Sequence, residues 1–283
     1  MKRAFQIETE QGLVSGFVGL TENTSPHTKP VLVAIHGGTY TSQYFDVPGY
    51  SLIDRAIAAG FQIVALDRPG YGTTDALADG SEMLDRNAHH ISKLMPEILS
   101  QLGLSGKGII LIGHSMGGVI ATTIAANQPD WPLLGIICTG FAQNLPMHLA
   151  EGFAALPEQY FIELPVDMKD QLMFGPTETL AKTMPRASHL ANTHMPRAEA
   201  IDIASDWAIR APSILGKVTV PVYYKLAEFE QLWQVADQPT VADMYTNTPR
   251  LETGVFKGAG HCIDFHECGA RFHDEILSFA ASL

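Results

Sequence analysis

The stretch of sequence that decides the fold is GIILIGHSMGG, residues 108–118. Its first half is an apolar run suited to a buried strand, and GVIATTIAANQ (118–128) behind it suits an apolar helix. A Gly-x-Ser-x-Gly turn between a strand and a helix predicts a sharp bend that raises Ser115 above the carboxyl end of the sheet. Gly113 and Gly117 fit this bend because a Cβ on either side would clash. We therefore expect Ser115 to be a nucleophile.

Short apolar runs of the same kind recur along the chain, separated by segments long enough for crossover helices. Continuous apolar strands are typical of a parallel sheet that is covered by helices on both faces. Their alternation with helices predicts an α/β fold with a mostly parallel, doubly wound sheet. The runs are VLVAI (31–35), FQIVAL (61–66), GIILI (108–112), LLGIIC (133–138), VPVYYKLA (220–227) and LETGVFKG (251–258).

The segments around these strands are also interpretable. Residues 4–20 alternate between apolar and polar and predict an antiparallel hairpin at the edge of the sheet, followed by a polar turn over residues 21–30. Residues 51–60 and 87–103 suit helices, and we expect Pro96 to kink or break the second of them.

Residues 141–212 interrupt the alternation of strands and helices. They hold five of the ten methionines and seven prolines, together with scattered aromatic residues. We predict a mostly helical cap insert here, set into a core formed by residues 1–140 and 213–283. The apolar side of the insert either lines a pocket, for which methionine is well suited, or simply packs onto the sheet.

Composition excludes several classes of function. The chain has 283 residues and a net charge of -12, which argues against nucleic-acid binding and against docking on anionic membranes. No apolar run is long enough to span a bilayer, and the first residues lack the apolar core of a secretory signal. Three cysteines are too few and too odd in number for a disulfide framework. We expect a cytoplasmic protein that acts on a small molecule, and the sequence does not predict its oligomeric state.

A serine hydroxyl needs a base to become a nucleophile. His261 is the candidate because Gly258-Ala259-Gly260-His261 follows the last predicted strand and precedes a C-terminal helix. A carboxylate should orient this imidazole, and in such folds it lies between the serine and the histidine in chain order. Glu230 and Glu228 both follow the fifth predicted strand. We favour Glu230 and keep Glu228 as the alternative.

An oxyanion hole needs two backbone N–H groups directed at the developing charge. We expect one from Met116, directly after the nucleophile, and one from Gly38 in the loop after the first predicted parallel strand, with Thr39 as an alternative. His36 in the same loop is interpreted as a structural residue.

Further residues near the predicted site are expected to contact the substrate, namely Thr39, His114, Phe141 and Cys262. We do not expect Cys262 to be a nucleophile, because no elbow and no feature that would lower its pKa accompany it. The sequence carries neither the HExxH spacing of a metal site nor a Gly-rich nucleotide-binding motif after a strand. We therefore predict neither a metal nor a cofactor.

Taken together, these motifs resemble the α/β-hydrolase superfamily. The resemblance rests on His36-Gly37-Gly38, on Asp67-Arg68-Pro69-Gly70-Tyr71-Gly72, on Gly113-His114-Ser115-Met116-Gly117-Gly118, on the Glu228/Glu230 segment and on Gly260-His261. They occur in the family's order and cover nearly the whole chain. The resemblance implies the α/β-hydrolase fold, with residues 141–212 as the cap that shapes substrate choice.

Two features qualify the resemblance. The family's acid is most often Asp, whereas this chain offers Glu, and a serine at position 115 argues against haloalkane dehalogenases and related epoxide hydrolases. The resulting prediction is a carboxylesterase-like hydrolase that cleaves an ester, thioester or lactone through an acyl-enzyme. The alternatives are a carbon–carbon bond hydrolase or hydroxynitrile-lyase-like enzyme with the same triad, and a non-catalytic binder of small molecules.

Overall fold

A computed structural model describes residues 1–21 and 29–283, so most of the turn predicted over residues 21–30 lies outside the described residues. Within the described residues, eight strands form one sheet in the order β1-β2-β4-β3-β5-β6-β9-β10. The strands are β1 (Lys2–Thr9), β2 (Gly12–Gly19), β3 (Val31–Ile35), β4 (Gln62–Leu66), β5 (Ile109–His114), β6 (Leu133–Thr139), β9 (Val222–Ala227) and β10 (Leu251–Phe256).

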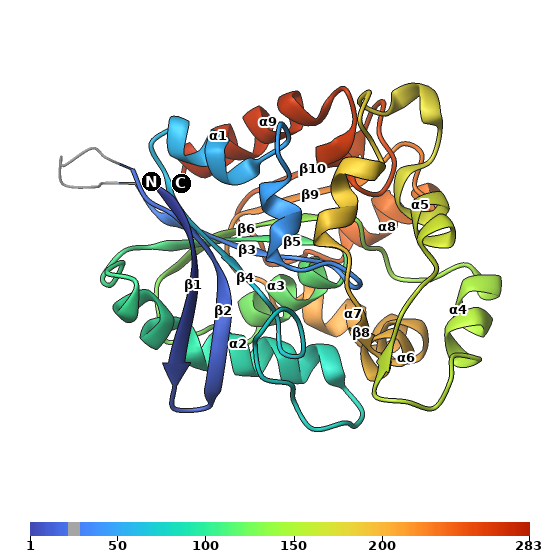
Figure 1. Ribbon diagram of the computed structural model, residues 1–283, viewed down its shortest axis with the longest axis horizontal. Coiled ribbons are helices and arrows are strands. Elements are labelled where there is room, and N and C mark those ends of the chain that lie inside the picture. Colours follow the sequence, from blue (N-terminus) through green and yellow to red (C-terminus); the bar gives the residue numbers. More distant parts are fainter. Residues whose placement is uncertain (22–28) are drawn as a thin grey trace.

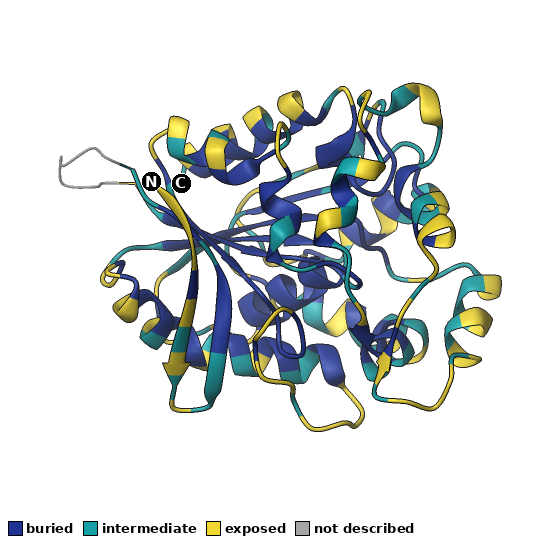
Figure 2. Cartoon of the chain, in the orientation of Figure 1, coloured by how far each residue is buried: buried dark blue, intermediate teal, exposed yellow. Residues whose placement is uncertain are grey.

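The sheet is mostly parallel, as the apolar runs predict. Strands β4, β3, β5, β6, β9 and β10 run parallel, whereas the β1–β2 hairpin joins β4 antiparallel. Every residue of β3 and of β5 is buried, because helices cover both faces of the sheet. Figure 2 shows this as a dark blue centre.

The helices form the two outer layers. In Figure 1, α1 and α9 lie together on one face of the sheet, and α2 and α3 lie on the other. Since the parallel strands end at the same edge, the loops behind them meet there, and chemistry in such sheets is expected at that edge. The helices of the core are α1 (Leu52–Ala58), α2 (Met83–Gln101), α3 (Met116–Ala126), α8 (Gln238–Asp243) and α9 (Gly269–Ala281).

Helix α2 differs from its prediction in two respects. It begins at Met83, four residues before the predicted start, and it continues through Pro96 without a break. Proline lacks the N–H that would bond the carbonyl of Ser92 one turn earlier. The indole Nε1–H of Trp131 donates to that carbonyl at 2.9 Å instead. A partner from outside the helix thus satisfies the acceptor that Pro96 leaves free.

Residues 141–212 form short helices and a small second sheet at the carboxyl edge of the strands, on the right in Figure 1. Helix α6 contacts α2, and α7 contacts α3, whereas α4 has no buried residue at all. The elements are α4 (Met147–Ala154), β7 (Phe161–Ile162), α5 (Val166–Phe174), β8 (Met195–Pro196), α6 (Arg197–Ser205) and α7 (Trp207–Leu215), with 3-10 turns at Thr177–Thr179 and Arg186–Ala191.

Among the helices of the described residues, none combines the length and the apolar character needed to cross a membrane. The remaining single turns of the core are Ser42–Asp46, Val235–Asp237 and Ile263–Phe265.

Candidate active site

Ser115 occupies the bend between β5 and α3. Its backbone lies at φ 57 and ψ -126, a strained conformation for a residue with a side chain. The glycines on either side are required by close packing: a Cβ on Gly113 would lie 2.3 Å from the carbonyl oxygen of Gly117, and one on Gly117 would lie 2.0 Å from that of Ile35. The bend therefore presents the Ser115 side chain at the carboxyl edge of the sheet.

His261 and Glu230 form a buried pair in the loops that follow β10 and β9. The distance from His261 Nδ1 to Glu230 Oε1 is 2.8 Å, and both side chains are completely buried. The same carboxylate oxygen accepts the N–H of Leu232 at 3.1 Å, which fixes its orientation. An ionised carboxylate only accepts hydrogen bonds, so Nδ1 is the donor and Nε2 is left as the acceptor of the neutral ring.

Glu228, the alternative acid, lies elsewhere. Its carboxylate accepts hydrogen bonds from Lys257 Nζ at 2.8 Å and from the N–H of Gly258 at 2.9 Å. The hydrogen bond from the ammonium is the first cause that holds the pKa of Glu228 below its usual value. The structure thus brings Glu230, and not Glu228, to His261.

The imidazole of His261 lies beside the bend. Its ring centroid is 4.7 Å from that of His114, the residue before Ser115. Gly140, behind β6, leaves room for both rings, because a Cβ there would lie 3.0 Å from His261 Cε1. His261 Nε2 is buried and has no hydrogen-bond partner among the described residues. The second ring nitrogen of the pair is therefore available to accept a hydrogen bond.

The two predicted oxyanion donors line the same cavity as Ser115. Gly38 follows β3, and Met116 is the first residue of α3. Neither backbone N–H donates to another group of the described residues. Free N–H groups at a helix start and in a loop facing it are suited to stabilise a developing negative charge. The neighbouring Thr39 has a positive φ of 62, which is rare for a β-branched residue.

The cavity itself is small and almost entirely apolar, with a volume of about 40 Å³. No Asp, Glu, Lys or Arg is among the residues that line it. Most of its wall comes from residues 145–203 and from the loop after Glu230. The sequence analysis did not identify these lining residues individually. They are Leu145, Phe153, Leu164, Leu172, Met173, Met195, Ile203, Leu232 and Trp233.

Of the four residues predicted to contact the substrate, Thr39 lines this cavity and the other three do not. His114 stacks against Tyr44, with ring centroids 4.7 Å apart and an interplanar angle of 9°. Burial lowers the pKa of His114 to about 3, so this ring is neutral at physiological pH. The stacked His114 ring is therefore part of the packing around the Ser115 bend.

Phe141 and Cys262 are buried in packing roles instead. Phe141 is completely buried and contacts the rings of Trp207 and Tyr224. Cys262 is also completely buried, with its Sγ 3.7 Å from the hydroxyl of Tyr40. Burial raises the pKa of the Cys262 thiol to about 12, so it is not a thiolate nucleophile. Neither side chain lines the cavity, and contact of either with substrate stays a prediction.

His36 has the structural position that was expected. Its Nε2 accepts the backbone N–H of Arg68 at 3.1 Å. The Arg68 guanidinium binds Glu199 of α6 through two hydrogen bonds of 2.7 and 3.0 Å, and Tyr71 donates to the same carboxylate at 2.6 Å. This completely buried cluster joins the loops after β3 and β4 to α6. The sequence did not indicate Glu199.

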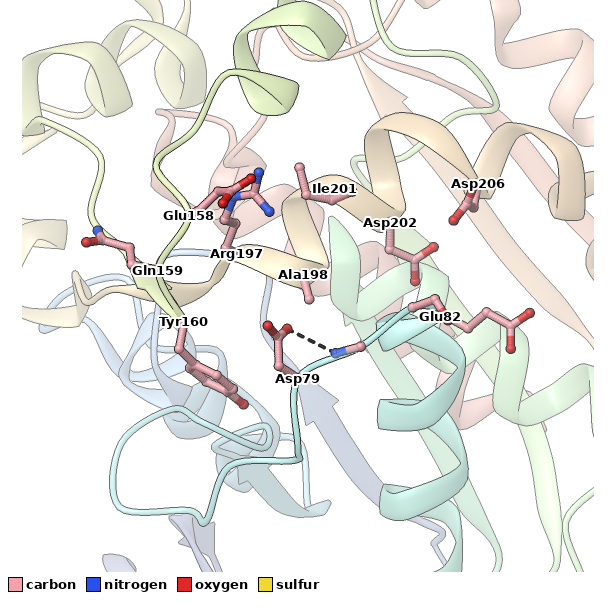
Figure 3. Close-up of a pocket in the computed structure, with 12 residues that line it drawn as sticks. Asp79, Glu82, Glu158, Gln159, Tyr160, Arg197, Ala198, Ile201, Asp202 and Asp206 are labelled. Carbon is pink, nitrogen blue, oxygen red and sulfur yellow. Dashed lines mark hydrogen bonds between the residues drawn. The ribbon is translucent and has the colours of Figure 1, made fainter.

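A second, larger hollow lies beside α6 and the start of α2 (Figure 3). Its volume is about 560 Å³, and its charged lining residues are mainly acidic, with Arg197 as the cation. The acidic residues are Asp79, Glu82, Glu158, Asp202 and Asp206. This hollow contains neither the strained Ser115 bend nor the unused backbone N–H groups of Gly38 and Met116.

The described residues also contain no group of three or more His, Cys, Asp or Glu side chains that is placed to hold a metal ion.

Comparison with known proteins agrees with this geometry. The sequence matches the alpha/beta hydrolase family over residues 32–275, which is most of the chain. The chain belongs to the alpha/beta hydrolase family. This membership, together with the eight-stranded, mostly parallel sheet, confirms the predicted fold class and the predicted resemblance. It also supports an enzyme.

Individual relatives of this alpha/beta hydrolase are distant. A segment of 78 residues is 31% identical to the 2-hydroxy-6-oxononadienedioate/2-hydroxy-6-oxononatrienedioate hydrolase of Escherichia coli, and it covers 28% of this chain and 25% of that protein. The match thus spans a quarter of the length of that curated relative.

Similar solved structures cover the whole chain. The monoacylglycerol lipase of Paleococcus ferrophilus has a TM-score of 0.67 and 19% identity, over 100% of this chain and 98% of its own. A soluble variant of monoglyceride lipase from Saccharomyces cerevisiae has a TM-score of 0.72 and 15% identity, over 98% and 94%. At such identities the likeness shows the fold alone.

Proposed function

We propose that this alpha/beta hydrolase cleaves a carboxylic ester, thioester or lactone through an acyl-enzyme on Ser115. The observation that carries the proposal is the buried His261–Glu230 pair, whose imidazole centroid lies 4.7 Å from that of His114, the residue before the strained Ser115. Two unused backbone N–H groups, from Gly38 and Met116, complete the set of parts that acyl transfer needs.

In the proposed reaction, Ser115 Oγ attacks the substrate carbonyl and its proton passes to His261 Nε2. Glu230 holds Nδ1–H and stabilises the imidazolium that forms. The N–H groups of Gly38 and Met116 bind the oxyanion, and His261 then returns its proton to the leaving oxygen or sulfur. Water, deprotonated by the same imidazole, attacks the acyl-enzyme and releases the acid.

The cavity favours a neutral, apolar substrate. Its wall consists of aliphatic, methionine and aromatic side chains with no cation. Burying a carboxylate without a partner is costly. We assign the wall mainly to a cap of residues 141–212 above a core of residues 1–140 and 213–283.

A second candidate is the hydrolysis of a carbon–carbon bond by the same residues. The observation in its favour is the segment shared with the E. coli dienedioate hydrolase. A dioate carries two carboxylates, however, and the cavity offers no cation to receive either of them. We therefore place ester, thioester or lactone cleavage first.

A fluorophosphonate probe and a series of nitrophenyl esters of increasing chain length test the proposal. Wild-type protein should be labelled at Ser115 and should hydrolyse apolar esters, whereas Ser115→Ala should do neither. Ser81→Ala, an exposed serine in the acidic hollow, is the matched control and should behave as wild type.

Three outcomes would contradict the proposal in different ways. Equal ester turnover by wild type and Ser115→Ala would remove the assigned nucleophile. Cleavage of a vinylogous diketone without ester turnover would select the carbon–carbon bond hydrolase. Folded wild-type protein that the probe does not label would select a non-catalytic binder.

A further inference from the structure

Lys169 is an unusual residue near the site. It lies on α5, and its side chain is buried to 2% exposure although it bears an ammonium group. Its Nζ donates to the carbonyl oxygen of Thr39 and to Asn192 Oδ1, each at 2.5 Å. The same Nζ lies 3.3 Å from the ring centroid of Tyr40. Both described hydrogen-bond acceptors are neutral oxygens.

The acceptor of Lys169 belongs to the loop that holds Gly38. Thr39 follows Gly38 directly and lies at a positive φ of 62, a strained conformation for a β-branched residue. Surrounding contacts must therefore hold it. Thr39 also lines the cavity, so its backbone connects the oxyanion donor to the substrate wall.

Hydrogen bonds from residues 191–193 hold the same loop. The N–H of Thr193 donates to the Thr39 carbonyl at 3.0 Å, and the N–H of Thr41 donates to the carbonyl of Ala191 at 2.9 Å. Tyr40 and Asn192 form an isolated β-bridge between these bonds. Lys169 thus adds to the contact that already exists between residues 39–41 and residues 191–193, and it connects α5 to both of these segments.

From this geometry we infer that Lys169 is a positioning residue that ties α5 to the oxyanion loop and keeps the Gly38 N–H directed at the reacting carbonyl. The inference rests on the proposed function, because it assigns Lys169 a role in that reaction. It does not make Lys169 a catalytic residue, since its ammonium contacts Thr39, Tyr40 and Asn192 and does not line the cavity.

A purely structural role for Lys169 predicts that its removal lowers stability and leaves the rate unchanged. Burial lowers the pKa of Lys169 to about 7, so the buried ammonium is itself unfavourable in the folded protein. Replacing such a group by an apolar side chain of similar length is expected to be neutral or stabilising. A variant that loses rate without losing stability therefore distinguishes positioning from simple packing.

The test compares the wild type with Lys169→Met, which keeps the length and removes the donors. We expect kcat on the best nitrophenyl ester to fall about 10- to 100-fold, less than the loss of a complete oxyanion donor. KM should change less than about twofold, and the melting temperature should not fall. A trifluoromethyl ketone that mimics the tetrahedral adduct should bind more weakly by the same factor as kcat/KM.

The control is Lys182→Met, an exposed lysine nearby in the chain, which should match the wild type in every readout. Should Lys169→Met fail to fold, the smaller Lys169→Leu is judged by the same criteria. A folded variant with unchanged kcat, or one that loses only stability or KM, overturns the inference. Failure of the proposed function is recognised separately, because the wild type itself would then show neither labelling of Ser115 nor ester turnover.

Discussion

Two buried imidazole–carboxylate pairs occur among the residues that the structure describes, and they have nearly the same geometry. His261 and Glu230 are joined at 2.8 Å, and His273 and Asp264 at 2.9 Å. Each imidazole also has a second nitrogen without a partner among the described residues. By distance and burial alone, the two pairs are hard to tell apart.

Their surroundings differ. Asp264 also accepts the hydroxyl of Tyr44 at 2.7 Å, so both of its oxygens are occupied. The hollow at His273 contains Ser51, but that hydroxyl donates to Asp46 and caps α1 from an ordinary φ of -70. Ser115 instead has a strained backbone and two unused N–H groups near it. A histidine–carboxylate pair becomes a candidate catalytic base only beside such a serine.

The strongest test of the difference between the two pairs is to remove each imidazole in turn. His261→Ala should lower kcat by at least about 10³-fold, because Ser115 then has no base. His273→Ala should keep kcat within a few-fold and lower stability instead. Ester turnover with purified, folded variants checks both, and the comparison fails if His273→Ala is the variant that loses activity.

The carboxylates give the next largest effect. Glu230→Gln should lower kcat about 10²- to 10⁴-fold, since an amide no longer fixes the tautomer of His261 or stabilises its charge. Glu228→Gln is the matched control, and it should stay within about twofold because Glu228 pairs with Lys257. Steady-state kinetics at saturating ester measure both. Equal losses in the two variants would contradict the assignment of the acid.

The second pair should show its importance in stability. Asp264→Asn leaves His273 and Tyr44 without their shared carboxylate. Breaking one partner of a buried pair costs about 3 kcal/mol or more, so the free energy of unfolding in urea should fall by that order. kcat should stay within about fivefold. Unchanged stability together with a large loss of kcat would show that the catalytic pair is His273–Asp264 and not His261–Glu230.

The most gradual expected effect is an acid sensitivity that involves both regions. Burial lowers the pKa of His266 to about 4, and its neutral Nε2 accepts the N–H of Gly260, next to His261. The unfolded chain takes up this proton near pH 6.5. Stability should therefore be complete above about pH 6.5 and fall by about 1.4 kcal/mol per pH unit for this group as the pH drops towards 4.

His266→Gln checks the acid sensitivity, because its side-chain oxygen still offers an acceptor to Gly260 while it does not titrate. Urea unfolding between pH 7 and 4.5 should show a shallower slope in this variant than in the wild type. If stability depended on pH with the same slope in both proteins, a group other than His266 would cause the acid sensitivity.

Sequence reasoning reached the sheet and the elbow because these depend on local patterns. Buried parallel strands such as 31–35 are continuous apolar runs, and the Ser115 bend needs glycine at particular neighbours. The chain order of serine, acid and base then led to Glu230 and His261. The preference for Glu230 over Glu228 agrees with the observed contact, although the role itself remains a proposal.

The cavity wall and the contacts that hold it were beyond sequence reasoning. Residues 141–212 form short helices, and α4 buries none of its residues, so periodicity there does not reveal which side chains face Ser115. Pairings such as Arg68 with Glu199, or Trp131 with the carbonyl left free by Pro96, join residues far apart in the chain. They depend on the folded arrangement and not on any local pattern.

The volume beside Ser115 has a consequence for how the molecule receives its ligand. At about 40 Å³, it is far smaller than the 560 Å³ of the hollow beside α6. Ser115 itself is only half-buried, but under the proposed function an acyl chain that follows the apolar wall has to displace side chains to find room. We expect entry to depend on how readily the side chains of Met173 and Met195 change rotamer. The preferred acyl chain length should then reflect the flexibility of these side chains more than the shape of the empty cavity.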